Sequence, residues 1–302
     1  MKNYPLVSIL MTSYNREKYI AEAIESVLAS TYTNFELIIT DDGSTDETVK
    51  IARGYEVKDS RVKIYINEKN LGDYNNRNKA ASYAKGKYLK YLDSDDIMYA
   101  HCIELMVNAM EQFPAAAYGF NFNGVQNDNF KFPKSYTPYE AYFENFFITS
   151  FFYAGPGGAI IKRDIFEEMR GFSGKRYIGD VELWMKMSAK YSSIVFWPGL
   201  IWWRKHEVQE NKFERMDMQG VYSRHQLVID MLNQNDCPLN KQQIVIATDN
   251  FNRLYARKIY YYLLRMKFSQ AVFLYKNFKI PVRIFITALF PVNRIRKYLN
   301  FL

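Results

Sequence analysis

The chain has 302 residues, a formal net charge of +8 and 17% aromatic side chains, and this length suffices for one large domain and a smaller one. Its two cysteines, Cys102 and Cys237, exclude a disulfide framework and fit a reducing compartment. The sequence shows no N-terminal apolar core of signal-peptide length and no run of about 18 uncharged apolar residues, so we expect neither a secretory signal nor a transmembrane span.

The positive charge is concentrated near the C-terminus. Residues 250–302 hold eleven Lys and Arg and no acidic residue, whereas residues 1–249 hold 29 basic and 32 acidic residues. Charge asymmetry of this kind indicates an anionic partner surface, either a membrane or a nucleic acid.

Strands and helices are predicted to alternate through the first part of the chain. A capping box of Ser44 and Glu47 predicts a helix through about Arg53, and Gly86 suits the C-cap of the preceding predicted helix. This alternation favours a largely parallel sheet covered by helices. Apolar runs predict buried strands at 6–11, 35–40, 62–66 and 87–92, and amphipathic patterns predict helices at 16–30, 74–85 and 100–113.

The remainder of the chain is predicted to be less regular and then helical. An aromatic, loop-rich stretch at 123–153 separates two predicted strands, and from about residue 219 the pattern is all-helical. Further predicted elements are strands near 116–122, 158–161 and 196–203, helices at 165–170 and 180–191, and a helical hairpin of 255–267 and 269–278.

Three carboxylates follow the strand predicted at 87–92. They belong to Asp93, Asp95 and Asp96. Such a cluster is costly unless a cation or hydrogen-bond donors offset its charge. Ligands of α/β folds bind at the carboxyl ends of strands, and hard divalent cations prefer oxygen ligands. The cluster therefore predicts a divalent metal whose open coordination positions are filled by phosphate oxygens.

A second acidic pair, Asp41 and Asp42, ends the strand predicted at 35–40. The simpler interpretation is a helix N-terminus, where Asp and Ser are favoured, and it accounts for Ser44 and Asp46. It accounts less well for Asp42, whose carboxylate can accept a hydrogen bond from a nucleobase N–H or a ribose hydroxyl.

Three further residues have both a plain and a functional interpretation. Arg77 is either an ordinary surface Arg or a bidentate phosphate ligand, and the two acidic strand ends favour the ligand. Asp180, at a predicted helix start, is either an N-cap or a general base. His206 is either structural or exposed, or else binds diphosphate or a metal.

These motifs occur in the order found in a known family. Over about residues 5–210 the chain resembles the family 2 inverting glycosyltransferases, which have the GT-A fold, and seven motifs in the right order make the resemblance specific. The matching segments are 7–16, 41–46, Asn70-Leu71-Gly72 with Arg77-Asn78, 86–96, 158–161 with 166–172, 180–184, and Trp203-Arg204-Lys205-His206.

The resemblance implies that the donor is a nucleotide-diphospho-sugar, with UDP as the favoured nucleotide. Thr12, Tyr14 and Asp42 would hold the nucleotide, Tyr14 by stacking on the base and Asp42 by accepting a uracil N–H. Arg77 would contact the ribose or diphosphate region, and Asp93 would bind the ribose.

The resemblance also implies a metal site and a catalytic base. Asp95 would hold Mn or Mg against the donor diphosphate, with His206 near the diphosphate or the metal. Asp180 would deprotonate an acceptor hydroxyl, and a single in-line displacement would invert the anomeric carbon. Asp96 is either structural or supports the metal ligands.

One departure from the family pattern bears on the base. Many relatives have Glu-Asp before the Leu-Trp helix, whereas this chain has Gly179-Asp180. The base is retained, but a neighbouring carboxylate is lost, and Glu182 close by offers a second acidic group.

The resemblance implies a fold and a division of the chain. We expect an α/β, GT-A Rossmann-like, mostly parallel sheet flanked by helices over 1–215, followed by a basic helical region over 216–302. The apolar segment 280–290, flanked by basic residues, either covers the core as part of a helical subdomain or lies on an anionic membrane surface, and we favour the membrane.

The expected partners follow from these assignments. They are a nucleotide-sugar, a glycan or lipid-linked saccharide acceptor of cell-surface polysaccharide synthesis, and the inner face of the cell membrane. We expect the protein to be cytoplasmic and peripheral to that membrane. We expect no nucleic-acid partner. The rival functions are a metal-dependent phosphotransferase or phosphatase and a non-enzymatic metal- or nucleotide-binding module. The first is disfavoured because the strand at 6–11 carries no nucleophilic Asp.

Overall fold

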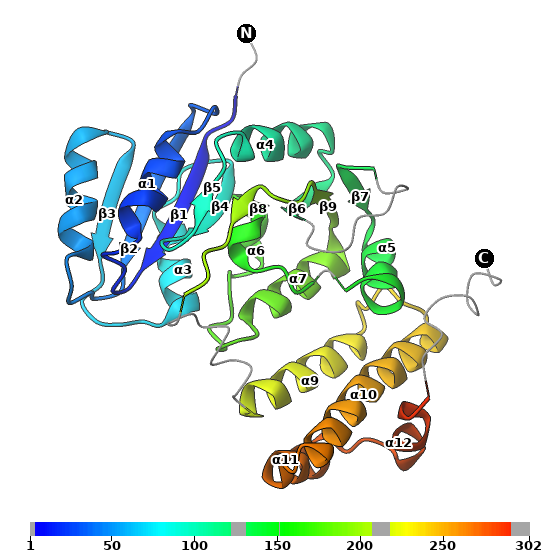
Figure 1. Cartoon of the computed structure of the whole chain (residues 1–302). Helices are drawn as coiled ribbons and strands as arrows, with labels where there is room; N and C mark the ends of the chain where they lie inside the picture. The colour runs from blue at the N-terminus through cyan, green and yellow to red at the C-terminus, as the bar shows by residue number, and fades with distance from the viewer. Residues whose placement is uncertain (1–3, 122–130, 151, 207–217, 291–302) are drawn as a thin grey trace.

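A mixed sheet of eight strands, covered by helices, runs through the part of the chain that the structure describes (Figure 1). This computed structural model describes residues 4–121, 131–150, 152–206 and 218–290. The strand order is β3-β2-β1-β4-β8-β6-β9-β7. The expected α/β class, with helices flanking a large central sheet, is therefore confirmed.

The first half of the sheet is parallel, as predicted. The central strand β1 (Val7–Ser13) pairs with β2 (Phe35–Asp41) and β4 (Tyr88–Asp93), and β2 pairs with β3 (Val62–Ile66). Strands β1, β2 and β4 are mostly apolar and almost wholly buried, because helices cover both faces of the sheet. The helices of this half are α1 (Ile20–Leu28), α2 (Thr48–Lys58), α3 (Asp73–Ser82) and α4 (Cys102–Gln112).

The second half of the sheet is mixed. Strand β8 (Ala159–Lys162) runs antiparallel to both β4 and β6 (Ala116–Asn121). Strand β9 (Ser192–Phe196) is parallel to β6, and β7 (Lys134–Tyr136) is antiparallel to β9. The largely parallel arrangement expected from the sequence thus holds throughout β1 to β4, whereas in the second half only the β6–β9 pair of the described strands is parallel.

Two sequence predictions in this half need correction. The strand expected at 196–203 is broken after β9 at Gly199, whose φ is +74°. The chain then forms β10 (Ile201–Trp202), which pairs with β5 (Ile97–Met98) outside the main sheet. The stretch expected to be loop-rich, 123–153, also contains β7, α5 (Pro138–Phe143) and a π-helix, η1 (Glu144–Ile148). Residues 123–130 and 151 of that stretch lie outside the described residues.

Two predicted caps are wrong, and tertiary contacts explain both. Ser44 does not cap α2, because its Oγ donates to Asp41 Oδ2 at 2.6 Å and the helix begins at Thr48. Gly86 does not cap α3, which ends at Ser82. Gly86 instead lies so close to β1 that an added Cβ would stand 2.6 Å from the backbone nitrogen of Ser8.

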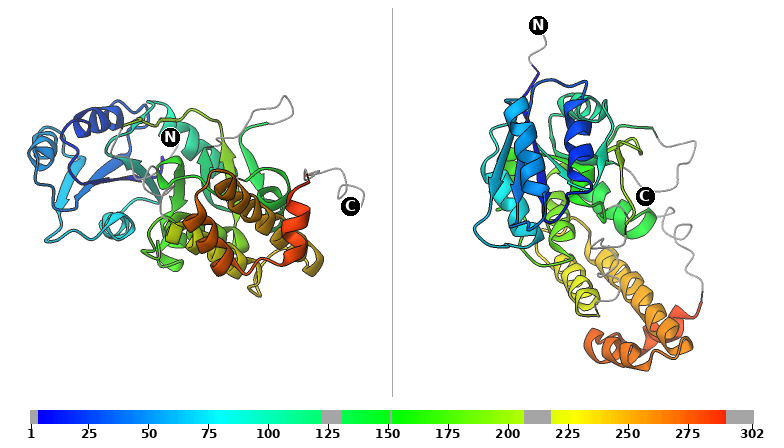
Figure 2. Two further views of the ribbon diagram at one scale, coloured as in Figure 1. Left: turned by 60° about the horizontal axis from the view of Figure 1, so that its bottom comes forward. Right: turned by 60° about the vertical axis from the view of Figure 1, so that its left-hand side comes forward.

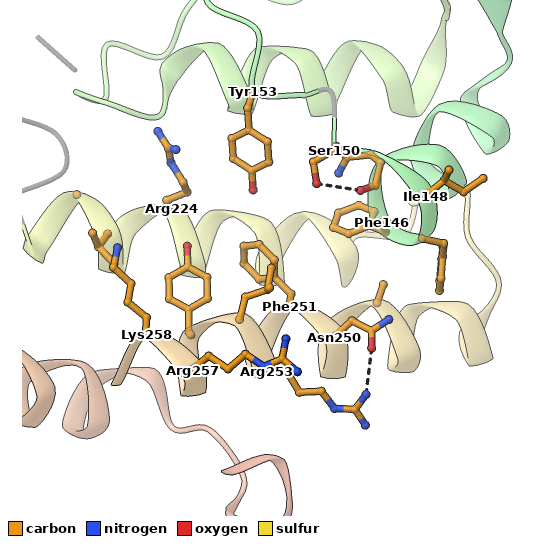
Figure 3. Close-up of a pocket in the computed structure, with 17 residues that line it drawn as sticks. Phe146, Ile148, Ser150, Tyr153, Arg224, Asn250, Phe251, Arg253, Arg257 and Lys258 are labelled. Carbon is orange, nitrogen blue, oxygen red and sulfur yellow. Dashed lines mark hydrogen bonds between the residues drawn. The ribbon is translucent and has the colours of Figure 1, made fainter. Parts of the chain in front are cut away.

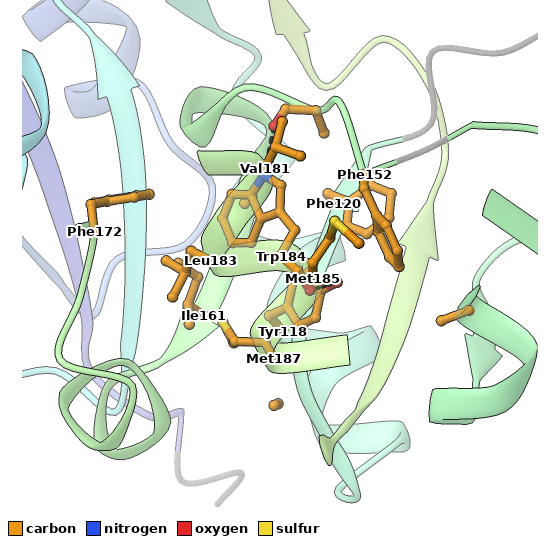
Figure 4. Packing of buried hydrophobic residues seen from close by; sticks show 14 of the residues in the cluster. Tyr118, Phe120, Phe152, Ile161, Phe172, Val181, Leu183, Trp184, Met185 and Met187 are labelled. Carbon is orange, nitrogen blue, oxygen red and sulfur yellow. Dashed lines mark hydrogen bonds between the residues drawn. The ribbon is translucent and has the colours of Figure 1, made fainter. Parts of the chain in front are cut away.

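The core of the second half is aromatic and is centred on helix α7 (Gly179–Lys190) (Figure 4). Trp184 is fully buried, and its ring stacks on Tyr118 with 5.3 Å between centroids. Its indole Nε1 donates to the carbonyl of Ala154 at 2.7 Å, so the one polar atom of the ring is satisfied. This packing fixes α7, and hence its N-terminal Asp180, against the sheet.

The C-terminal helices divide between two hydrophobic clusters. Helix α9 (Met218–Leu232) and the first half of α10 (Lys241–Leu264) pack into the core of the sheet. The second half of α10 packs with α11 (Phe268–Phe278) and α12 (Val282–Ala288) into a cluster of its own, which lies away from the sheet (Figure 2). The boundary expected between residues 215 and 216 stays a prediction, and residues 207–217 lie outside the described residues.

Within the described ranges, no helix combines the length and the apolar character that crossing a membrane requires.

Replacement of Gly86 tests the close approach of this residue to β1. We expect Gly86→Ala to lower the free energy of unfolding by about 1–3 kcal/mol, because the new Cβ meets the backbone of β1. The matched control is Gly54→Ala in the exposed part of α2, where an added Cβ meets nothing within 4 Å and where we expect a gain of about 0.5–1 kcal/mol. Denaturant unfolding measures both, and equal effects would contradict the close approach.

Candidate functional site

An open cavity of about 1340 Å³ lies at the carboxyl ends of β1, β2 and β4. The structure brings together all of the residues that the sequence analysis predicted to form the site. Those lining the cavity are Thr12, Tyr14, Asp42, Arg77, Asp93, Asp95, Asp180 and His206. They come from separate segments of the chain, so only the topology of the sheet makes them neighbours.

Asp42 organises the loop in front of α3. Its Oδ1 accepts from the backbone nitrogen of Leu71 and from Asn67 Nδ2, each at 2.8 Å, and its Oδ2 accepts from the nitrogen of Gly72 at 2.9 Å. Gly72 has a φ of +80°, which favours glycine at this turn. The carboxylate is 4% exposed and has one acceptor position of Oδ2 left for a ligand.

Two residues at the end of β1 form another wall of the cavity. Thr12 is half-buried at the sheet edge, and the ring of Tyr14 is exposed on the side of the cavity. An exposed aromatic ring beside Asp42 can stack on a planar base. The nucleotide roles predicted for these residues stay predictions.

Arg77 is buried behind Asp93. Its Nη2 donates to Asp93 Oδ1 at 2.6 Å and its Nε donates to Asp73 Oδ1 at 2.9 Å. Although burial opposes it, the charges of Asp73 and Asp93 raise the pKa of Arg77 well above its usual range. Its Nη1 has no hydrogen-bond partner among the described residues. The arrangement holds Asp93 in place and leaves one donor for the ribose or diphosphate contact that the sequence predicts.

Lys90 is a buried cation that the sequence analysis missed. It lies in the middle of β4 and is fully buried, and its Nζ donates to the carbonyls of Tyr91 and Gly157. Burial lowers the pKa of Lys90, while the charges of Cys102, Asp93 and Asp96 oppose this shift. Gly157 belongs to a loop that lines the cavity, so Lys90 anchors that loop beside the acidic cluster.

Asp95 lies between two groups from distant segments. Its Oδ2 accepts from Arg16 Nε at 3.0 Å and stands 2.9 Å from His206 Nε2. Neither the spacing nor the composition of the sequence indicated that Arg16 would reach Asp95, because the two are 79 positions apart.

Asp95 and His206 carry the kinds of atom that bind divalent cations, a carboxylate oxygen and an imidazole nitrogen. Asp95 Oδ2 and His206 Nε2 are 2.9 Å apart, within hydrogen-bond distance of each other, so the predicted metal site stays a prediction. No group of three or more His, Cys, Asp or Glu side chains converges on one point within the described ranges. A cation held by two protein ligands would complete its coordination with phosphate oxygens and water.

Asp96 ties the acidic cluster to the segment that carries His206. Its Oδ1 accepts from the backbone nitrogen of Arg204 at 3.0 Å, and Arg204 Nε donates to the carbonyl of Asp95 at 3.0 Å. Burial, followed by the charge of Asp93, raises the pKa of Asp96 to about 8. Asp96 therefore positions the chain on which His206 lies, and Arg204 is a site residue to which the sequence analysis gave no role.

Asp180 is the second residue of α7 and lines the cavity. It is not the N-cap, which is Ile178, and its Oδ1 accepts from the backbone nitrogen of Val181 at 2.7 Å. The N-cap interpretation is therefore wrong. The role of general base stays a prediction.

Glu182, the other acidic group of this helix, does not line the cavity. Its carboxylate accepts from Ser173 Oγ at 2.5 Å and from Lys186 Nζ at 2.7 Å. Although burial opposes it, hydrogen bonds from Lys186 and Ser173 hold the pKa of Glu182 below its usual range. These contacts favour Asp180 over Glu182 as the group that meets a ligand.

Comparison with known proteins places this geometry among sugar-transferring enzymes. Residues 8–170 match the model of the family described as Glycosyl transferase family 2. A similar sequence is the UDP-Glc:alpha-D-GlcNAc-diphosphoundecaprenol beta-1,3-glucosyltransferase WfgD of Escherichia coli, which is 45% identical over 125 residues, or 41% of this chain and 48% of WfgD. The match thus spans about half the length of that relative.

Two solved structures share the fold at low sequence identity. TarS 1-349 of S. aureus in complex with UDP-GlcNAc has a TM-score of 0.72 and 19% identity, over 92% of this chain and 82% of that chain. The mannosyltransferase PcManGT of Pyrobaculum calidifontis, in complex with GDP-Man and Mn2+, has a TM-score of 0.59 and 15% identity, over 96% and 88% of the two chains. Likeness at this identity establishes the fold.

Replacement of Arg77 tests the buried ion pairs behind the cavity. We expect Arg77→Met to lower the free energy of unfolding by about 2–3 kcal/mol, because Asp93 and Asp73 lose a buried, charged hydrogen-bond donor. The matched control is Arg53→Met on the surface of α2, where the lost pair with Glu56 is exposed and contributes less than about 1 kcal/mol. Thermal and denaturant unfolding compare the two, and a loss at Arg77 no larger than that at Arg53 would contradict the role of Arg77.

Proposed function

Because the chain belongs to glycosyl transferase family 2, we propose that it transfers a sugar from a nucleotide-sugar donor to a hydroxyl group of a glycan acceptor, with inversion at the anomeric carbon. The observation that carries the proposal is that the predicted donor-binding residues and the predicted base line the same cavity. The acceptor hydroxyl and the donor sugar would meet between Asp93 and Asp180.

Asp180 is the proposed base. Its carboxylate takes the proton of the acceptor hydroxyl as the oxygen attacks the anomeric carbon, and the diphosphate leaves from the opposite face. The single displacement inverts the configuration. One protein carboxylate suffices, because the leaving diphosphate needs its charge stabilised and does not need a proton.

The donor is held at the ends of β1, β2 and β4. Tyr14 stacks on the base, Asp42 and Thr12 bind the nucleoside, and Asp93, oriented by Arg77, binds the ribose. Asp95 and His206 hold a divalent cation, Mn or Mg, which when bound offsets the charge that develops on the leaving diphosphate. Arg16 contacts Asp95 at 3.0 Å and adds a fixed positive charge at the same place.

The nature of the substrates follows by analogy. We infer a UDP-sugar as the donor, because the printed name of WfgD specifies UDP-Glc and TarS was solved with UDP-GlcNAc. The same relative's name specifies a diphosphoundecaprenol-linked acceptor, which supports a lipid-linked saccharide as the acceptor here.

The rival phosphotransferase has less support. A nucleophilic Asp would have to lie at the end of the first strand, and β1 (Val7–Ser13) contains none. A non-enzymatic nucleotide-binding module also has less support, because it would not account for the presence of Asp180 in the cavity.

Replacement of the base tests the proposed reaction. We expect Asp180→Asn to lower the rate of UDP release from a UDP-sugar, in the presence of Mn2+ and a lipid-diphosphate-linked sugar, by roughly 10²–10⁴-fold. The matched control is Asp164→Asn, because Asp164 is exposed in the first turn of α6 (Arg163–Glu168) and its Oδ1 also accepts from the next backbone nitrogen, at 2.9 Å. We expect the control to keep full activity.

Donor binding is measured separately by thermal shift with a panel of sugar nucleotides, since a ligand that binds the folded state raises Tm. We expect both Asp180→Asn and the wild type to be stabilised by the same UDP-sugar. If no UDP-sugar raises the Tm of the wild type, the proposed donor is wrong.

We also propose that the C-terminal helices bind the anionic inner face of the cell membrane. One face of α12 is buried through Ile284 and Ala288, while Val282 and Ile286 are exposed, so this helix both packs on α10 and presents apolar side chains to the outside.

The junction of α10 and α11 also exposes apolar side chains, those of Leu264, Met266 and Phe268. Basic residues surround them, and no acidic residue follows Asp249, which fits an anionic lipid surface. The basic residues Arg294, Arg296 and Lys297 lie outside the described residues.

Removal of two apolar side chains tests this membrane contact. We expect Leu264→Gln with Phe268→Gln to lower partition onto phosphatidylglycerol vesicles by roughly tenfold. Full burial of a large apolar side chain in the membrane contributes about 1.5–3 kcal/mol, and each replacement removes part of this free energy. The control Val57→Gln alters a side chain that is 89% exposed on α2, far from these helices, and should leave partition unchanged. Vesicle sedimentation measures both, and unchanged partition of the double variant would refute the contact.

A further inference from the structure

A second cavity adjoins the first and lies between η1, α9 and α10 (Figure 3). Its volume is about 600 Å³, enough for a phosphate-bearing group and several carbons of an apolar chain. Tyr153 and Arg224 line both cavities, so the two are continuous at this point.

The two cavities differ in charge. The first is lined by six aspartates and also by six Lys and Arg residues, so its formal charges balance. The second is lined by the cations Arg224, Arg253, Arg257 and Lys258 and by no carboxylate among the described residues. The net positive lining of the second cavity would attract an anionic group on an acceptor.

Within the described ranges, the hydrogen bonds of Arg253 and Arg257 go to uncharged groups. Arg253 donates to Thr287 Oγ1 at 3.2 Å and to Asn250 Oδ1 at 3.3 Å, and Arg257 donates to the carbonyl of Ala288 at 2.9 Å. The contacts orient both guanidinium groups and leave their charge available to an anion.

The remaining wall of the second cavity is apolar. Phe146 and Ile148 of η1 and Phe251 and Leu254 of α10 line it, and Figure 3 shows Tyr153 and Phe251 pointing toward one another across it. Cations and an apolar wall in one cavity suit a ligand that joins a phosphate group to an apolar chain.

We propose that the second cavity binds the phosphate group and the first carbons of the lipid of a lipid-linked saccharide acceptor, so that the acceptor sugar reaches Asp180 in the first cavity. This inference rests on the proposed function and adds the part of the acceptor that the enzyme recognises. The lipid would continue toward α12, because Arg253 and Arg257 of this cavity contact Thr287 and Ala288.

Arg224 joins the two halves of this acceptor site. Its Nη2 donates to the carbonyl of Tyr177 at 2.8 Å, and its guanidinium lies 5.4 Å from the ring centroid of Tyr153. Tyr177 has a φ of +65° and precedes Asp180 by three positions. An acceptor held beside Arg224 would therefore contact the same side chain that fixes the backbone leading to the base.

The test measures binding of farnesyl diphosphate, below its micellar concentration, to the full chain by isothermal titration calorimetry. Saturating UDP and Mn2+ fill the donor side of the first cavity. We expect farnesyl diphosphate to bind more tightly than either inorganic diphosphate or farnesol, and Arg253→Gln with Arg257→Gln to weaken it by at least about tenfold. The matched control Arg265→Gln removes an exposed cation of the same region that does not line the cavity, and should change binding less than about twofold.

A second pair of variants applies if the double replacement loosens α12. Leu254→Glu places a carboxylate in the cavity wall and should abolish binding of farnesyl diphosphate, whereas Leu263→Glu, at a similarly exposed position of α10 outside the wall, should not. The inference is wrong if inorganic diphosphate or farnesol binds as tightly as farnesyl diphosphate, or if UDP competes with farnesyl diphosphate for binding. UDP binding is measured in the wild type and in the same variants. A wild type that binds UDP but not farnesyl diphosphate refutes this inference alone, whereas a wild type that fails to bind UDP refutes the proposed donor.

Discussion

The structure of the site depends on how the negative charge at the end of β4 is offset. Asp93, Asp95 and Asp96 lie within four residues at a mostly buried strand end, where like charges repel strongly. The cations that offset this charge are buried or half-buried and come from four segments of the chain. They are Arg16 after β1, Arg77 on α3, Lys90 within β4 and Arg204 beyond β10.

This arrangement explains why so many loops converge on one point. Each cation also binds the backbone or side chains of its own surroundings, so offsetting the acidic cluster also fixes the loops that form the cavity wall. Lys90 holds the loop at Gly157, and Asp96 holds the segment of Arg204. A bound ligand would therefore have to offset only part of the negative charge of the cluster. That part lies at Asp93 and Asp95, which are more exposed than Asp96.

The proposed base belongs to a different part of the protein from the acidic cluster. Asp180 is positioned by the packing of α7, whose Trp184 is buried in the aromatic core, and by Arg224 of α9, which donates to the carbonyl of Tyr177. In the proposed reaction, the first half of the sheet would bind the donor, and α7 and the helices that follow would bind the acceptor.

The sequence by itself determined the α/β class, the first four strands, and the residues gathered in the cavity, because strand ends and short motifs are local patterns. It did not determine the mixed half of the sheet, the break at Gly199, or the failure of Ser44 and Gly86 as caps, since distant contacts override local preference there. Tertiary structure alone decided that Arg16 meets Asp95 and that a second, cationic cavity adjoins the first. The reason is physical: which charges offset one another depends on distances across the fold, and no spacing along the chain encodes them.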